Sequence, residues 1–335
     1  MKTARKATTP FESEIAPQGG PQVCSRNGCT LTLFKPGADT YAKTRHPLKH
    51  GLYHEIKTPE ATLQFNLNGE IVRAQGCADR WPSSLEWLKR TAGNDWVYYS
   101  TGGYAGTYET LGANLLSDPI RFRIPTPYNE IYKATGEYYL PNLPYESNAI
   151  LGGDPFGHPE VAGLVKSWHA VLARAAAAMQ GLAAPFAAFL RTALENTPEV
   201  LQARAEALFA MTAGRLAVLP PDTRHVDYNV MPLRVAEGCR YKCRFCRVKS
   251  DRPFRVFSRS AVDRQIEQLK AFFGADRVNY NAVYLAGSDA LGAGKDLLLY
   301  ALDRALAALG PGESCMQGCS VLDRKSTRLN SSHYS

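Results

Sequence analysis

Three cysteines lie close together in the second half of the chain, in the segment GCRYKCRFC. They are Cys239, Cys243 and Cys246, which gives the spacing C-x3-C-x2-C. Thiolates bind soft metals, so this segment is a candidate ligand set for zinc or for an iron–sulfur cluster. Structural zinc usually takes four ligands from paired C-x2-C knuckles, and bacterial ferredoxins use C-x2-C-x2-C with a further cysteine before proline. Neither pattern fits, and three thiolates on a four-iron cluster would leave one iron open to a substrate or cofactor.

The elements around the cysteines predict parallel β/α units. A short apolar strand, MPLRVAEG (231–238), leads into the cysteine loop. Ser258 is a candidate N-cap for a helix through Phe273. NAVYLAGSD (281–289) reads as a second buried strand, and KDLLLYALDRALAALG (295–310) as a second helix. Strand, loop and helix in alternation are typical of a parallel sheet, and the segment ESCMQGCSVL is expected to begin a third strand.

The cysteine motif and its setting resemble the radical S-adenosylmethionine (SAM) superfamily. The matching residues are the three cysteines, which follow a first strand, and Phe245, the aromatic before the last of them. After its second strand, that family has a small glycine-rich motif that contacts the methionyl amino group of SAM. Its positional counterparts here are Gly287, Ser288 and Asp289, without the common G-G-E form. The resemblance covers about residues 228–322.

The resemblance implies an α/β fold, the start of a partial (β/α)6 barrel, preceded by an N-terminal α+β region and a helical connector. It implies that Cys239, Cys243 and Cys246 hold three irons of a [4Fe–4S] cluster, while the amino and carboxylate groups of SAM chelate the fourth. Reductive cleavage of SAM would give a 5′-deoxyadenosyl radical that abstracts a hydrogen atom from a substrate. The site would lie at the carboxyl ends of the strands.

Several alternatives stay open at the level of sequence. The chain is a candidate for a tRNA-modifying radical SAM enzyme, or for a non-catalytic iron–sulfur or zinc module in binding or electron transfer. Nine basic residues lie from Arg234 to Arg259, against Glu237 and Asp251. This excess favours either an ordinary solvated surface or the docking of a flavodoxin- or ferredoxin-type electron donor over RNA binding, because aromatics that could stack on bases are few. The segment after the second strand also fits an ordinary β-to-α turn with a polar cap.

The rest of the chain divides by composition. The predicted organisation is a disordered N-terminus (1–30), an α+β region of unknown role (31–157), a helical connector and linker (158–227), a truncated radical SAM domain (228–322) and a non-native tail (323–335). Asp323 to His333 resemble one translated frame of a sequencing adapter, so we expect a fragment that ends within a domain and is itself inactive.

Local patterns predict elements in the N-terminal half. The Asn68–Gly69 pair between two alternating runs predicts a hairpin. The segment SSLEWLKRTAG (83–93) predicts a short helix, and DWVYYS (95–100) predicts a strand. From Pro159 onward, apolar residues recur with helical spacing, which predicts three helices, the last one starting at Thr197–Pro198.

Other potential metal ligands are assigned structural roles. His46, His50 and His54 lie four residues apart, but proline and glycine interrupt the intervening sequence, so loop histidines at the surface are expected. Cys24 and Cys29 are expected to be lone thiols in a mobile segment.

Composition narrows the class of protein. The chain has 335 residues, of which 45% are hydrophobic and 21% charged, and its formal net charge is +8. Eight cysteines in this length do not indicate a disulfide scaffold. The first twenty residues lack the apolar core of a signal peptide, and no uncharged run is long enough to span a bilayer. We therefore expect a cytoplasmic protein with reduced thiols and no membrane partner.

Overall fold

The structure is a computed structural model whose contacts divide the chain into two compact units, Met1–Ala203 and Arg204–Ser335. The residues it describes are 20–36, 52–77, 80, 86–100, 138–141, 155–212, 230–241, 253–280, 282–286, 289–309 and 318–321. Across these residues, no helix combines the length and apolar character that crossing a membrane requires.

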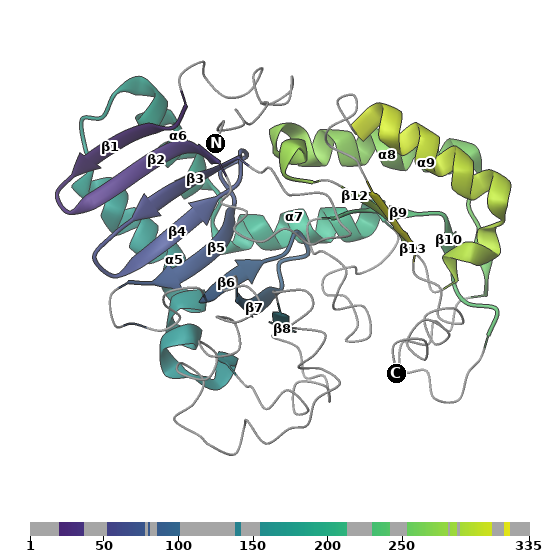
Figure 1. Cartoon of the computed structure of the whole chain (residues 1–335), viewed down its shortest axis with the longest axis horizontal. Helices are drawn as coiled ribbons and strands as arrows, with labels where there is room; N and C mark the ends of the chain where they lie inside the picture. Colours follow the sequence, from purple (N-terminus) through teal and green to yellow (C-terminus); the bar gives the residue numbers. More distant parts are fainter. Residues whose placement is uncertain are drawn as a thin grey trace, which may run out of the picture. The chain divides into compact units, whose positions relative to one another are not determined.

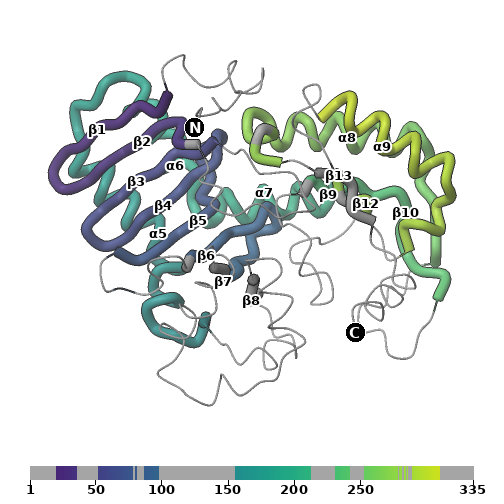
Figure 2. The backbone as a smooth tube through the Cα atoms, viewed as in Figure 1, coloured from purple at the N-terminus to yellow at the C-terminus, as the bar shows by residue number. Residues whose placement is uncertain are grey.

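The first unit holds an eight-stranded antiparallel sheet whose strands are neighbours in chain order (Figure 1). The strands are β1 (Gln22–Arg26), β2 (Cys29–Pro36), β3 (Leu52–Lys57), β4 (Ala61–Phe65), β5 (Ile71–Gly76), β6 (Glu86–Arg90), β7 (Trp96–Ser100) and β8 (Tyr138–Pro141). Figure 2 follows this meander from purple β1 to blue β7. Each strand therefore pairs with the strand that precedes it in the chain.

The sheet begins earlier than the sequence analysis placed it. β1 and β2 form a hairpin in which Arg26 faces Cys29, and its two turn residues are Asn27 (φ 49°) and Gly28 (φ 76°). Positive φ at both positions is the geometry of the mirror-image turns that match strand twist, and Asn-Gly favours it. The prediction of disorder for residues 1–30 is therefore wrong for its last part, where this Asn-Gly signal was missed.

The second Asn-Gly pair forms the predicted hairpin, so that prediction is confirmed. β4 and β5 pair antiparallel on either side of it, and Gly69 has φ 75°. The side-chain Oδ1 of Asn66 accepts the backbone N–H groups of Asn68 (3.0 Å) and Glu70 (2.9 Å). These bonds satisfy two donors that the turn takes out of the sheet.

The prediction of a helix over residues 83–93 is wrong, whereas the strand predicted at 95–100 is confirmed as β7. The described part of the first segment forms β6, which pairs with β5 and β7. Leu88 is fully buried, and Ala74 faces it on β5. The partner strands supply the hydrogen bonds, so sheet pairing outweighs the local helix preference.

Three helices follow the sheet, as predicted: α5 (Pro159–Ala178), α6 (Ala184–Glu195) and α7 (Pro198–Met211), with a short 3-10 turn, η2 (Pro155–Gly157), before them. α5 and α6 cover one face of the sheet (Figure 1). Trp168 and Leu172 of α5 and Phe189 of α6 belong to the same buried cluster as Leu31 and Phe65 of the sheet. The predicted connector at 158–227 is thus wrong for α5 and α6, which form the second layer of the first unit.

The second unit contains a three-stranded parallel sheet in the order β13–β12–β9. Its elements are β9 (Val230–Arg234), β10 (Ala236–Glu237), β11 (Arg255–Val256), α8 (Arg259–Phe273), η4 (Gly274–Asn279), β12 (Ala282–Ala286), η5 (Ala290–Ala293), α9 (Lys295–Leu309) and β13 (Gly318–Val321). α8 connects β9 to β12, and α9 connects β12 to β13. The sequence analysis anticipated these strands and helices.

Polar contacts fix the two helices of this unit. Ser258 is the N-cap of α8, as predicted, and its Oγ accepts the N–H of Ala261 at 3.2 Å. Asp263 of α8 accepts hydrogen bonds from Tyr300 (2.7 Å) and Arg304 (3.0 Å) of α9. The hydrogen bonds from both groups lower the pKa of the Asp263 carboxyl. The two helices therefore lie side by side.

Candidate metal centre

Strand pairing joins the described residues on either side of the cysteine segment. β9 ends at Arg234, and the chain continues into β10, which pairs antiparallel with β11. An ion pair between Arg255 and Glu237 (2.9 Å) reinforces this ladder, and the N–H of Phe257 donates to the carbonyl of Val235 at 2.9 Å. The two ends of the segment between β10 and β11 are therefore held together beyond the carboxyl end of β9.

Cys239 is a free, half-buried thiol at the start of this loop. The preceding Gly238 is buried and has φ 72°, so the chain turns sharply there in a conformation that favours glycine. The backbone N–H of Tyr241 donates to Sγ of Cys239 at 3.4 Å. An amide donor of this kind stabilises thiolate charge, and such bonds also tune the potential of iron–sulfur clusters.

The remaining residues of the predicted site lie outside the described part of the chain. These are Cys243, Phe245, Cys246, Gly287 and Ser288. Within the described residues, which include only one of the three cysteines, no group of three or more His, Cys, Asp or Glu side chains could hold a metal ion. The three-thiolate site therefore stays a prediction.

Asp289 is the described residue of the predicted SAM motif, and it is buried. Its exposed fraction is 4%, and its Oδ2 makes no hydrogen bond within the described part of the chain. Gly292 lies against it, because a Cβ at Gly292 would come within 2.7 Å of Asp289 Oδ2 and 3.0 Å of Phe254 Cζ. A larger residue at 292 would displace these side-chain atoms, so Gly292 allows a close approach to the buried carboxylate and to Phe254.

Arg240 ties the cysteine loop to the loop that follows β12. Its guanidinium donates to the carbonyl of Gly292 at 2.7 Å and lies over the ring of Phe254 at 4.3 Å from the centroid. One side chain next to Cys239 thus contacts the residues that enclose Asp289. The sequence analysis missed Arg240, Phe254 and Gly292, although a cation beside the cysteine motif was a visible signal.

The carboxyl end of β9 is fixed from the helix side. Gln265 of α8 is 4% exposed, and its Oε1 accepts the N–H of Arg234 at 2.6 Å. The neighbouring strand β12 is in parallel register, with Ala286 opposite Arg234. The starting points of both loops are therefore held by backbone pairing and by a buried amide.

Arginines around the loop stack on aromatic rings. Arg255 lies 5.7 Å from the ring centroid of Phe257, and Arg259 lies 4.7 Å from that of Tyr300. Stacking keeps a guanidinium at a fixed place while it retains its charge. Aromatic contacts therefore hold Arg255, which also pairs with Glu237, and Arg259 at the start of α8.

The other candidate ligands take structural positions. His54 is in β3 and only 6% exposed, so the prediction of a surface loop is wrong for it; His46 and His50 lie outside the described residues. Cys24 and Cys29 lie in β1 and β2 rather than in a mobile segment. Burial raises the pKa of the Cys29 thiol, which disfavours the thiolate that a metal would need.

Comparison of the chain with models of protein families, with curated protein sequences and with solved structures finds no match.

Proposed function

We propose that Cys239, Cys243 and Cys246 hold a [4Fe–4S] cluster and that the protein is a radical SAM enzyme. The observation that supports this best is the position of the cysteine loop. It is closed at its base, it follows the first strand of a parallel sheet, and Arg240 joins it to the loop after the second strand. In parallel β/α folds, cofactor and substrate sites form from loops at the carboxyl ends of the strands.

The described residues fit these cofactors in two respects. The Cys239 thiol is half-buried and receives an amide hydrogen bond, and hydrogen bonds to ligand sulfurs tune the potentials of iron–sulfur clusters. The Asp289 carboxylate is enclosed, and a buried carboxylate oxygen without a partner is unfavourable until a cationic group binds it. The amino group of SAM is a group of that kind.

Each residue then has a defined task. The thiolates fix the cluster, Asp289 accepts the ammonium group of the nucleotide, and Gly292 and Phe254 exclude water from that carboxylate. When bound, the cluster supplies the electron that cleaves SAM reductively and so provides the radical for hydrogen abstraction. Arg240 is a positioning residue, because it holds the two loops together.

The arginines around the loop suit an acidic electron donor. Arg255 and Arg259 are exposed and held by aromatic contacts. A fixed positive surface attracts a flavodoxin- or ferredoxin-type protein and accelerates its docking, an effect that salt weakens. The proposed substrate is a small molecule or an RNA.

Anaerobic reconstitution with iron and sulfide tests the cluster. We expect about four irons per chain, as a [4Fe–4S] cluster requires, and a loss of most of that iron in Cys239→Ser, Cys243→Ser and Cys246→Ser. Cys24→Ser is the matched control, because Cys24 lies in β1 of the other unit, and it should keep the full iron content. A chain that takes up one zinc ion and no sulfide would contradict the proposal.

The nucleotide site is tested by paramagnetic resonance of the reduced cluster. SAM should change the spectrum of the wild-type protein, and Asp289→Asn should keep the cluster but need at least about tenfold more SAM, because the charged hydrogen bond is lost. Glu237→Gln is the control, since Glu237 pairs with Arg255 at the base of the same loop. A spectrum indifferent to SAM would refute the proposed activity, and a normal response in Asp289→Asn would refute the role of Asp289.

A further inference from the structure

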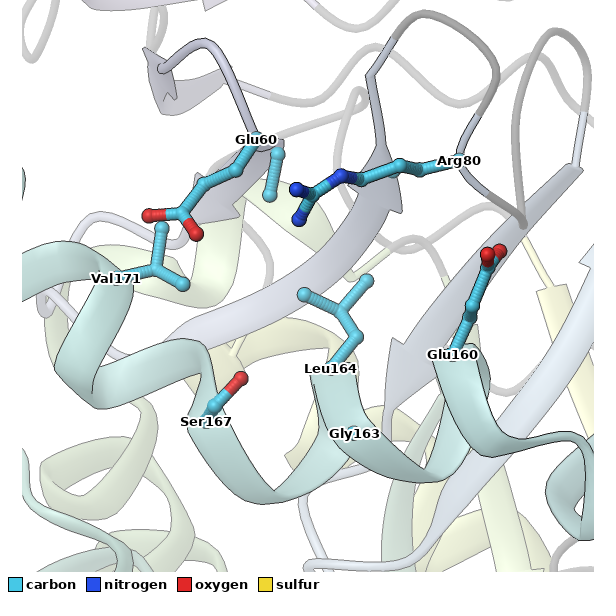
Figure 3. Close-up of a pocket in the computed structure, with 9 residues that line it drawn as sticks. Glu60, Arg80, Glu160, Gly163, Leu164, Ser167 and Val171 are labelled. Carbon is cyan, nitrogen blue, oxygen red and sulfur yellow. The ribbon is translucent and has the colours of Figure 1, made fainter.

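A pocket of about 380 Å³ opens between α5 and the ends of β4 and β5 in the first unit. Its volume lies within the range of about 300–1,000 Å³ that small-molecule sites occupy. Figure 3 shows the Arg80 side chain extending toward Glu60, whose carboxylate lies beside Val171, with Leu164 and Ser167 of α5 nearby. Charged, hydroxyl and aliphatic groups therefore line one cavity.

Arg80 is fixed at this pocket by its backbone. Its N–H donates to the carbonyl of Cys77 at 3.1 Å, and its own carbonyl lies only 2.6 Å from the point where a Cβ at Gly76 would be. This close approach requires glycine at the end of β5. In the described part of the chain, no carboxylate forms an ion pair with the Arg80 guanidinium, so its charge is available to a ligand.

Glu60 offers the opposite charge. Arg174 binds it through two nitrogens, at 3.1 and 2.7 Å, and both bonds end on Oε1. Among the described residues, no hydrogen bond ends on Oε2. One carboxylate oxygen is thus held in place while the other is open to a donor.

Gly163 leaves open space at the wall of the pocket. It lies inside α5, where glycine costs about 1 kcal/mol relative to alanine. A Cβ at this position would meet no atom within 4 Å, so packing does not require glycine. The helix therefore leaves open a volume that a better helix former would reduce.

The charges around the pocket select the class of ligand. Glu60, Glu160 and Arg80 line the pocket, and Arg174 pairs with Glu60 beside it. A phosphate dianion would be repelled by the carboxylates, and a simple cation would be repelled by Arg80. A molecule with no net charge but with separated positive and negative groups fits this arrangement.

We infer that the pocket binds a free α-amino acid with an aliphatic side chain. The ligand carboxylate pairs with Arg80 and accepts from Ser167, its ammonium group donates to Oε2 of Glu60, and its side chain lies against Leu164 and Val171. This site is in a different unit from the cysteine loop, so it does not depend on the proposed cluster.

The test uses the full chain with L-leucine as the probe. All four tryptophans precede residue 204, so their fluorescence reports the unfolding of the first unit. L-leucine should raise the unfolding midpoint in proportion to the logarithm of its excess over Kd. Glycine at the same concentration controls for general solute effects, and 4-methylpentanoate, 3-methylbutylamine and inorganic phosphate should each bind at least tenfold more weakly.

Two variants locate the binding. Gly163→Leu should raise the midpoint without ligand and abolish the response to L-leucine, because its side chain fills the pocket. Arg80→Met should weaken L-leucine at least tenfold, whereas Arg191→Met, an exposed arginine on α6, should not change it. Three results would overturn the inference. They are a failure of L-leucine to bind, binding of 4-methylpentanoate or phosphate as tight as that of L-leucine, and an unchanged response to L-leucine in Arg80→Met.

Discussion

His54 is a neutral hydrogen-bond acceptor inside the first unit. Its Nδ1 accepts the backbone N–H of Phe34 at 3.3 Å, and its ring lies 4.5 Å from that of Phe189. Phe34 has φ 53°, a left-handed conformation uncommon for aromatic residues, in an irregular stretch of β2. Burial lowers the pKa of His54 to about 4. The imidazole thus supports a strained strand only while it is uncharged.

This residue makes the stability of the first unit depend on pH. Between about pH 6.5 and 4 the unfolded chain binds a proton at this histidine and the folded chain does not, so protonation favours unfolding. The free energy of unfolding should fall as pH drops through this interval, by about 1.4 kcal/mol per pH unit and roughly 3 kcal/mol in total. Urea titrations followed by tryptophan fluorescence at several pH values measure this.

The control for this prediction is His54→Asn, which keeps an acceptor near the position of Nδ1 but does not titrate. Its unfolding free energy should decline less between pH 6.5 and 4 than that of the wild type. Parallel pH profiles for the two proteins would show that His54 is not responsible.

The residues of the proposed site were only partly predictable from sequence. Cys239 and Asp289 were identified because their types follow strands at recognisable places. His54 was placed at the surface because its neighbours include proline and glycine, and burial depends on which residues a strand faces. Arg240 and Gly292 act through contacts across 52 positions of sequence, which no local pattern records.

At the scale of elements, the two Asn-Gly hairpins offer a matched pair of glycines. Gly69 (φ 75°) and Gly28 (φ 76°) share a backbone conformation. A Cβ at Gly69 would lie 3.0 Å from Thr192 Cγ2 and 3.2 Å from the backbone N of Ala193 on α6, while one at Gly28 would lie 3.7 Å from Pro59. Gly69 therefore lies tightly against α6, whereas Gly28 has room for a methyl group.

Alanine at these two positions should therefore have different effects. Gly28→Ala should cost about 1–2 kcal/mol, the price of a left-handed L-residue. Gly69→Ala should cost about 1–3 kcal/mol more, because the added methyl group displaces α6. Denaturation followed by tryptophan fluorescence compares the two, and equal losses would mean that α6 does not pack against the hairpin as described.

Helices were easier to predict than strands for a physical reason. α5 and α8 show periodic apolar faces and N-caps, which are local features. β6 contains Glu, Leu, Lys and Arg, which favour helix, and only pairing with β5 and β7 makes it a strand. The secondary structure of this segment depends on residues elsewhere in the chain, so its local sequence alone predicted a helix.

At the scale of the molecule, the buried residues that a segment shares with its neighbours decide which unit it belongs to, and its amino-acid composition does not. The alanine-rich segment after Pro159 looks different from the sheet that precedes it, and this change in composition suggested a connector. Its buried faces nevertheless join the core of the sheet through residues such as Trp168 and Phe186. The parallel unit was predictable in its order of elements, because strand and helix signals there alternate without overlap.

Two cores predict two separable unfolding transitions, since each unit buries its own apolar side chains. Arg90 of the first unit is almost fully buried and pairs with buried Glu70 at 3.3 Å. Arg90→Met leaves that carboxylate buried without its cation, which should cost about 3–5 kcal/mol. Tryptophan fluorescence should show this loss, while hydrogen exchange of α8 in the second unit should stay unchanged. Ser258→Ala removes the N-cap of α8 at a cost of about 1 kcal/mol. It should speed the hydrogen exchange of α8 and leave the unfolding followed by tryptophan fluorescence unchanged. If either variant moves both signals together, the chain unfolds as one cooperative body and the two cores are coupled.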